Sequence, residues 1–349
     1  MTVLKGRPVA EADYADVQKQ LQDIFYRLLF APLVELLAPH NAQVKAAARE
    51  LKNSKSAVRE LRNASVAPVV NGIRSGKIQY SDGVFSGDFN AAISSALRSY
   101  GAQFNKTTGN FTLAPQDMPV EVLAAVNEYA DVARQLHEEL MKKIDEIGRN
   151  LTYTVGSADY RVDPERMVKK TESQFNKHYG DALGHEELSD RAKRELAKDY
   201  SDNMNLWIVN FAVDMIKDLR GIVAENAQKG YRFDNLVDKI QIRYDVVPTK
   251  AAFLARQETS LYVSKHKEQR FTDVGVVEYI WRTSGDSEVR TSPHGGHKAL
   301  NGKRFTFKDK AQAQYFSCGT PSNPGEDFQC RCVADPVLPG VLEEVGAGA

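Results

Sequence analysis

The sequence has few cysteines and no net charge. Its 349 residues include three cysteines, an odd number that is too small for a disulfide framework and is typical of a reducing compartment. Lysine and arginine together number 46, as do aspartate and glutamate. Because bulk binding to nucleic acid usually requires a clear basic excess, any contact with DNA must be local.

Long apolar runs and familiar catalytic loops are also missing. No stretch of about 18 uncharged apolar residues occurs, so the sequence predicts no membrane span. The N-terminal sequence MTVLKGRPVAEADYADV has neither an apolar signal region nor a small-residue cleavage site, which predicts synthesis in the cytoplasm without export. Neither a G-x4-GK[ST] phosphate loop nor a G-x-S-x-G nucleophile elbow is present.

Apolar residues at helical spacing are the main feature of the sequence. Hydrophobic residues make up 42% of the chain, which is enough for a real core. Apolar residues recur at helical spacing over residues 13–31, and Pro32 is expected to kink or restart that helix. Asp163-Pro164-Glu165 is a typical helix start, and Gly184 and Gly230 are plausible ends. Further helices are predicted at residues 44–64, 88–100, 120–147, 163–228, 233–243 and 249–271, with the apolar stretch 204–223 at the centre of the core.

Two β-hairpins are predicted within the helical chain. Asp82-Gly83 in GKIQYSDGVFSG lies between β-favouring residues, which is a strong signal for a tight hairpin turn. The segment AQFNKTTGNFTL predicts a second hairpin that turns near Thr108-Gly109. After Gly275 the chain becomes rich in glycine, proline, serine and asparagine, which indicates an irregular β-containing module.

The predicted fold class is therefore mainly α: a long-helix body with a small β-hairpin insertion at residues 76–113 and a small irregular α+β C-terminal module. Five segments are predicted along the chain: an N-terminal helical segment (1–75), a hairpin-containing insertion (76–118), a helical body (119–274), the C-terminal module (275–340) and a flexible tail (341–349).

All three cysteines lie between Cys318 and Cys332, in a segment that ends NPGEDFQCRC. With His297 they make a candidate Cys3His set for a structural zinc ion, which prefers four sulfur or nitrogen ligands in a tetrahedron. A metal would compensate for the small core of a module of about 65 residues. Two alternatives stay open. Cys330 and Cys332 could be reduced thiols packed as small apolar side chains, or Cys318 could form a disulfide with one of them.

Asp286, His294 and His297 could instead build a metal-dependent nuclease or hydrolase. Gly295 and Gly296 separate the two histidines, however, so these do not share a stable helix as a zincin motif requires. The sequence predicts that His294 lies in an exposed loop and that His297 hydrogen-bonds the local turn.

Arg256 and Glu258 are two positions apart on a predicted helix, so they do not share a face and each needs its own partner. They are expected to tie the helical body to the C-terminal module. Residues 286–310 carry a local basic surplus that could contact DNA or an acidic protein surface. Its members are Arg290, Lys298, Lys303, Arg304, Lys308 and Lys310, against Asp286, Glu288 and Asp309.

Three blocks of the sequence, in order, resemble the phage Mu F-like minor head proteins, also called phage head morphogenesis proteins. They are FLARQETSLYVSKHKEQRFTDVGVVEYIWRTSGDSEVR, HKALNGKRF and NPGEDFQCRC. The upstream stretches GKIQYSDGVFSGDFNAAISSAL and NLWIVNFAVDMIKDLRGIVAENAQKGYRF resemble one branch of that family. The sequence departs from the family pattern in two places, because TSPHGG lengthens the spacing before His297 and Cys318 matches no position. The motif residues are Arg256, Glu258, Arg290, His297, Gly302, Cys330, Arg331 and Cys332.

This resemblance implies a minor capsid protein of a tailed double-stranded DNA phage, located in the virion head at the portal vertex. Its expected partners are the portal protein and the major capsid or scaffolding protein, with packaged DNA as a further candidate. It implies a role in procapsid assembly and in DNA delivery, and no enzymatic activity, membrane contact, small-molecule substrate or certain cofactor. The alternatives are the nuclease described above and a DNA-binding accessory protein that is ejected with the genome.

Overall fold

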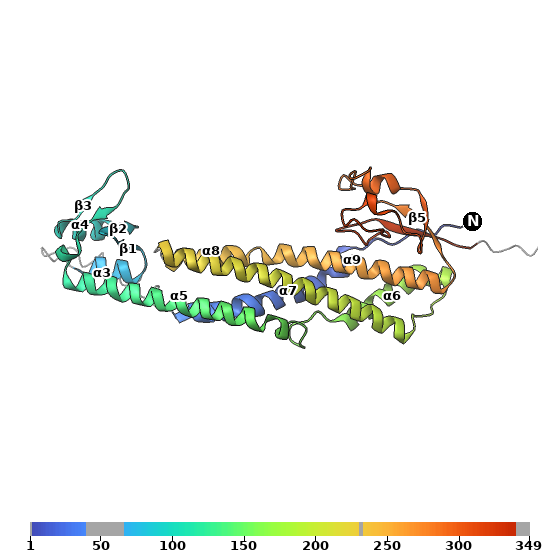
Figure 1. Ribbon diagram of the computed structural model, residues 1–349, viewed down its shortest axis with the longest axis horizontal. Coiled ribbons are helices and arrows are strands. Elements are labelled where there is room, and N and C mark those ends of the chain that lie inside the picture. The colour runs from blue at the N-terminus through green and yellow to red at the C-terminus, as the bar shows by residue number, and fades with distance from the viewer. Residues whose placement is uncertain (1, 40–65, 230–232, 340–349) are drawn as a thin grey trace, which may run out of the picture. The chain divides into compact units, whose positions relative to one another are not determined.

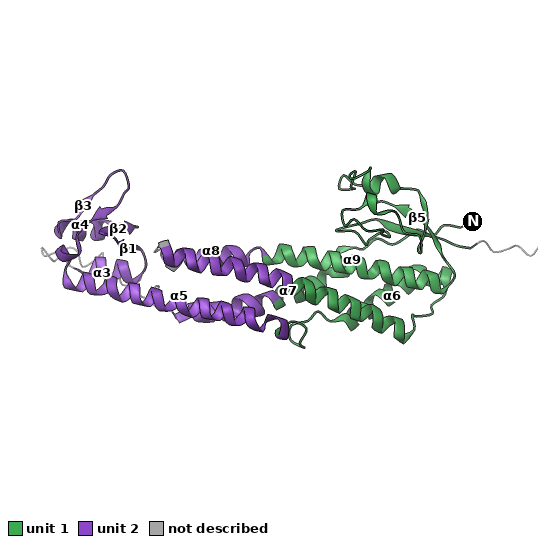
Figure 2. Ribbon diagram, in the orientation of Figure 1, with its two compact units in different colours: residues 1–24, 154–209, 247–349 green, residues 25–153, 210–246 purple. Residues whose placement is uncertain are grey.

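The computed structural model describes residues 2–39, 66–229 and 233–339, which are mainly α-helical with small antiparallel sheets (Figure 1). The predicted fold class is thereby confirmed. The chain divides into two compact units (Figure 2). Unit 1 comprises residues 1–24, 154–209 and 247–349, and unit 2 comprises residues 25–153 and 210–246. The five segments predicted from the sequence stay a prediction about domain organisation.

Unit 1 is built mainly from long helices. They are most of α1 (Glu11–Phe25), α6 (Pro164–Leu183), the N-terminal part of α7 (Asp190–Lys229) and α9 (Val247–Asp273). The start of α6 confirms the prediction, because the Asp163 carboxylate accepts hydrogen bonds from the backbone N–H groups of Glu165 and Arg166. Gly184, at φ 89°, ends α6 and divides it from α7 as predicted.

The first helix continues past the proline that was expected to kink or restart it. α1 leads into a π-helical turn, η1 (Tyr26–Phe30), and regular helix resumes over residues 31–39. Proline has no N–H group, and in a regular helix its ring collides with the carbonyl four residues earlier. The π turn widens the helix directly before Pro32 and lets the chain pass. The structure therefore has a disturbed and then resumed helix, and this helix extends to residue 39, beyond the predicted limit of 31.

Unit 2 contains both predicted hairpins, which join into one sheet of order β1-β2-β4-β3. Asp82 and Gly83 have φ values of 52° and 84°, as a tight hairpin turn requires. The strands are β1 (Ile78–Ser81), β2 (Val84–Gly87), β3 (Gln103–Phe104) and β4 (Phe111–Thr112). Besides η1, the helix at residues 31–39 and the C-terminal part of α7, its helical elements are α3 (Ala67–Arg74), α4 (Ala91–Ser99), the short η2 (Pro115–Asp117), α5 (Val120–Thr154) and α8 (Phe233–Tyr244).

Helix limits differ from the predictions mainly at their ends. α5 continues to Thr154 instead of residue 147. Pro248, which was expected between the two helices, is the second residue of α9, where its missing N–H costs nothing. The predicted helix at 44–64, the helix stop at Gly230 and the tail at 341–349 lie outside the described residues. None of the helices in the described part of the chain is long and apolar enough to cross a membrane.

The C-terminal module of unit 1 is a small sheet of order β6-β5-β7 with long connecting loops. Its elements are β5 (Glu278–Arg282), η3 (Gly296–Leu300), β6 (Arg304–Thr306), η4 (Ala313–Tyr315) and β7 (Val333–Val337). Alternation along β5 buries Tyr279 and Trp281. These rings pack in one apolar cluster with Phe175 of α6 and Phe271 of α9, so the module shares its core with the helices.

A buried ionic cluster joins α6 to α9. The Oε1 atom of Glu172 lies 3.2 Å from Nε2 of His266 and accepts a hydrogen bond from the backbone N–H of Leu188. Its Oε2 atom lies 3.7 Å from an Arg270 guanidinium nitrogen. Burial lowers the pKa of His266. Burial by itself would raise the pKa of Glu172. Hydrogen bonding and charge from His266 and Arg270 outweigh this effect, so the pKa of Glu172 is lowered.

We expect the free energy of unfolding to decrease as the pH falls from 6.5, the usual pKa of histidine, to below 4.5, the usual pKa of glutamate. Both groups have a lower pKa in the folded chain, so the unfolded chain binds each proton more readily and gains from acidification. Urea unfolding at a series of pH values measures this. Glu172→Gln should remove the part of this loss that falls near and below pH 4.5 and belongs to the carboxylate, whereas Glu165→Gln, on the exposed start of α6, should not. A wild-type midpoint that is constant across this range contradicts the prediction.

Candidate metal centre

The C-terminal module brings three of the four predicted zinc ligands together. His297 comes from η3, and Cys330 and Cys332 come from the loop that leads into β7. Their ligand atoms all lie within 4.8 Å of one another, and all three side chains are buried. Gly296, at φ 52°, lets the start of η3 lie close to the backbone of Arg290. A Cβ atom at this position would be 2.7 Å from the Arg290 carbonyl oxygen.

The imidazole of His297 lies between two sulfurs and a carboxylate. Its Nδ1 atom is 3.5 Å from the Sγ atom of Cys330 and 3.5 Å from that of Cys332. Its Nε2 atom is 3.0 Å from Oδ2 of Asp327. The backbone N–H of Gly325 donates to the Cys330 sulfur at 3.3 Å. One ring nitrogen therefore faces both thiols, and the other is held by an acid.

Asp327 is the functional residue that sequence reasoning missed. Its carboxylate is fully enclosed and accepts hydrogen bonds from the backbone N–H groups of Ser317 and Cys318 as well as from the Arg290 guanidinium. It precedes Cys330 by three residues in NPGEDFQCRC, next to Glu326. Nothing in that spacing tells which of the two acids points inward.

Hydrogen bonds set the protonation of this group. Burial disfavours the His297 imidazolium, but hydrogen bonds and charge from Asp327 and Cys330 raise the pKa of His297 to about 9. Burial by itself would raise the pKa of Asp327, but the hydrogen bonds that the carboxylate accepts hold this pKa well below the usual range. The hydrogen bond between the thiols lowers the pKa of Cys330 and raises that of Cys332. The arrangement therefore favours a thiolate at Cys330, which is the form that binds metals.

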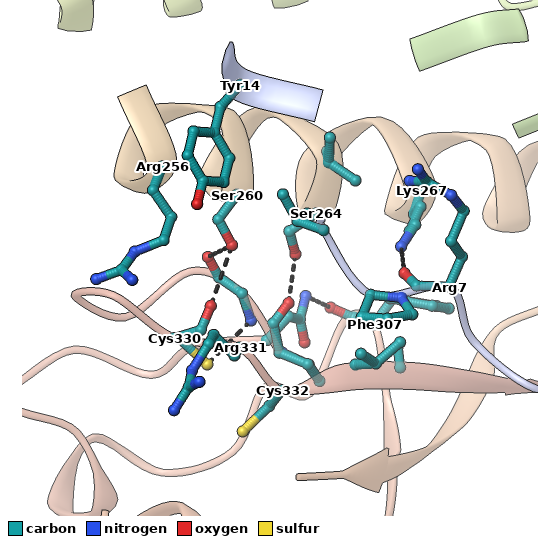
Figure 3. A pocket seen from close by; sticks show the side chains of 18 residues that line it. Arg7, Tyr14, Arg256, Ser260, Ser264, Lys267, Phe307, Cys330, Arg331 and Cys332 are labelled. Carbon is teal, nitrogen blue, oxygen red and sulfur yellow. Dashed lines mark hydrogen bonds between the residues drawn. The ribbon is translucent and has the colours of Figure 1, made fainter. Parts of the chain in front are cut away.

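Helix α9 holds the backbone of the cysteine loop (Figure 3). The hydroxyl of Ser260 donates to the Cys330 carbonyl at 3.1 Å, and the hydroxyl of Ser264 donates to the Pro324 carbonyl at 2.7 Å. A cavity of about 200 Å³ lies beside these contacts and is also lined by Lys267. The Cys332 sulfur points away from α9 in this view, toward the interior of the module.

Cys318 does not belong to the ligand group. Its sulfur instead forms local hydrogen-bond contacts, at 3.3 Å with the Thr320 hydroxyl and at 3.6 Å with the Ser322 hydroxyl. The predicted four-ligand set is therefore not assembled. All three cysteines are free thiols, so the structure does not contain the alternative disulfide either.

The residues of the alternative nuclease do not converge. Asp286 accepts a hydrogen bond from Arg331 at 2.8 Å, and neither Asp286 nor His294 joins His297 in a metal-binding group among the described residues. His294 lies in an exposed loop, as predicted, with φ at 48°.

The basic surplus of residues 286–310 is offset by acids from elsewhere in the chain. Arg290 pairs with Asp327, Lys310 with Glu326 at 2.9 Å, and Arg304 with Glu278 at 3.7 Å. None of these carboxylates lies in the segment itself, so its sequence alone overstates the positive charge. Arg331, from outside the segment, in turn pairs with Asp286. Contact of this surface with DNA stays a prediction.

The remaining motif residues have structural partners. As their spacing predicts, Arg256 and Glu258 turn to separate neighbours: Arg256 donates to the Gln329 side chain, and Glu258 accepts from the Trp207 indole at 2.7 Å. The first contact ties α9 to the module and the second ties it to α7. Gly302, at φ 76°, turns the chain between η3 and β6 and donates to the Trp281 carbonyl at 2.7 Å.

Comparison with known proteins identifies part of the chain. Residues 217–335 match the family described as Phage Mu protein F like protein. An uncharacterised protein of Haemophilus influenzae is 26% identical over 177 residues, which cover 46% of this chain and 37% of that protein. No solved structure matches the chain. The match begins in α7 and ends in β7, so it includes α9 and the whole candidate metal centre. Residues 217–335 are therefore a Phage Mu F-like region, as the three sequence blocks predicted.

Proposed function

We propose that this chain is a minor capsid protein of a tailed double-stranded DNA phage. It acts by protein–protein contacts at the portal vertex during procapsid assembly, with a further role in DNA delivery. The observation that carries the proposal is the match of residues 217–335 to the Phage Mu F-like family. Its partners are the portal protein and the major capsid or scaffolding protein, and its location is the virion head.

The enclosure of the imidazole–thiol group supports a structural role for it. His297, Cys330 and Cys332 are 3%, 4% and 9% exposed, so a substrate would not reach them without opening the module. The long helices suit docking to other particle proteins. At about 1.5 Å per residue, the 35-residue helix α5 is about 50 Å long and offers an extended surface.

We expect the full-length tagged chain to capture the portal protein from lysates of phage-producing cells, and deletion of its gene to reduce infectious particles by orders of magnitude. The reason is that every head has a portal vertex, so the loss of a vertex component affects every particle. Complementation with the wild-type gene should restore both head assembly and titre. Normal infectious heads from the deletion phage, or purified virions without this chain by mass spectrometry, would exclude the proposed role.

A further inference from the structure

We propose that His297, Cys330 and Cys332 bind one zinc ion, with Asp327 as a positioning residue. This site differs from the Cys3His set expected from the sequence, because Cys318 is not a ligand. The inference rests on the geometry of the module and does not depend on the proposed function.

The distances around Nδ1 of His297 fit a metal. Zinc binds sulfur at about 2.3 Å and nitrogen at about 2.0–2.1 Å in a tetrahedron, which places the nitrogen and each sulfur about 3.5 Å apart. The two observed separations between Nδ1 and the sulfurs are both 3.5 Å. Two sulfurs at equal distance from one ring nitrogen match the geometry of a cation shared by all three atoms, which would displace the proton from Nδ1.

The surrounding hydrogen bonds also match those of a metal site. A histidine ligand typically donates its other ring N–H to a carboxylate, which fixes the tautomer, and Asp327 accepts from Nε2 of His297 in this way. The Gly325 amide donates to the Cys330 sulfur at 3.3 Å, as backbone groups do to a thiolate. Asp327 is in turn held by Arg290, so the acid has a fixed position.

A buried donor supplies an independent observation at the same place. The indole N–H of Trp281 is fully buried and has no oxygen or nitrogen partner among the described residues. Trp281 belongs to the same buried cluster as Cys332. A negatively charged sulfur that ligates a metal would give this N–H an acceptor. One imidazole and two thiolates form a set that suits zinc, whereas magnesium and calcium prefer oxygen ligands.

The metal would hold together three parts of the module that have little regular structure. His297 fixes η3, Cys330 fixes the loop after Pro324, and Cys332 fixes the entry into β7. Small loop-rich modules often depend on such a ligand for stability. The zinc is therefore structural, and its removal should loosen the module more than the helices of unit 1.

The test uses the full-length chain, purified under reducing conditions without chelator from zinc-supplemented cells. Elemental analysis should find about one zinc per chain. Reconstitution with Co²⁺ should give the visible bands of a tetrahedral site and a near-ultraviolet band from two thiolates. Wild-type protein that holds no zinc after reconstitution, with all three thiols freely titratable, would overturn the proposal. This measurement requires no variant to fold.

Variants then identify the ligands. Cys330→Ser and Cys332→Ser should abolish stoichiometric zinc and the thiolate band, whereas the matched control Cys318→Ser should keep both. Asp327→Asn should retain the site but weaken zinc binding by about 10–100-fold in competition with a chromophoric chelator. Loss of zinc in Cys318→Ser would favour the four-ligand set and overturn this one. Zinc retained by a Cys330→Ser, Cys332→Ser double variant would identify only adventitious binding and overturn it as well.

Discussion

Replacement of Trp281 by alanine is expected to lower the free energy of unfolding by about 3–5 kcal/mol. Trp281 is fully buried at the centre of the module core. Its ring centroid lies 5.8 Å from that of Phe316, 5.8 Å from that of His297 and 6.0 Å from that of Phe305. Truncation removes these contacts and leaves a cavity that the two short neighbouring strands cannot close. Urea unfolding followed by far-ultraviolet circular dichroism measures the change.

Val277→Ala is the matched control for this prediction. Val277 directly precedes β5 but its side chain is 55% exposed, so its truncation should change the unfolding free energy by less than about 0.5 kcal/mol. If the alanine variant of Trp281 does not fold, Trp281→Phe should fold with a smaller loss because a ring remains. Equal midpoints for Trp281→Ala and wild type would show that the module core is not packed as described.

Replacement of Asp327 by alanine is expected to destabilise the chain by about 3–5 kcal/mol, because it leaves buried partners without a counter-charge. The carboxylate is 1% exposed and receives hydrogen bonds from two side chains, His297 and Arg290, and from the backbone of Ser317 and Cys318. The unfolding midpoint in urea, at neutral pH, gives the size of the effect.

Asp286→Ala provides a control with the same chemistry at the surface. Asp286 pairs with Arg331 at 2.8 Å, but both side chains are 40% exposed. Removal of an exposed ion pair costs about 0–1 kcal/mol, because water replaces the lost partner. A similar loss in the two variants would mean that the Asp327 site is open to solvent, which would contradict the enclosed arrangement on which the metal site depends.

Local features of the fold could be predicted from the sequence because each depends on neighbouring residues. Asp82-Gly83 determines its turn through backbone conformations that few residues adopt. Asp163 begins α6 with its own side chain, and Gly184 ends it. Pro32 shows the limit of such reasoning. The proline rule predicts a disturbance, but whether the helix ends or forms a π turn is decided by the packing of its buried residues, such as Leu29 and Phe30.

The sequence by itself determined the helical character of this chain, its hairpins, its phage Mu F-like blocks and the grouping of cysteines near its end. Only the tertiary structure decided that His297 meets Cys330 and Cys332, that Cys318 turns to nearby hydroxyls, and that Asp327 closes the site. The physical reason is distance along the chain. Turns and caps act over a few residues, whereas the imidazole and the thiols are more than thirty residues apart and meet only because the β5–β7 pairing and the shared aromatic core bring their loops together.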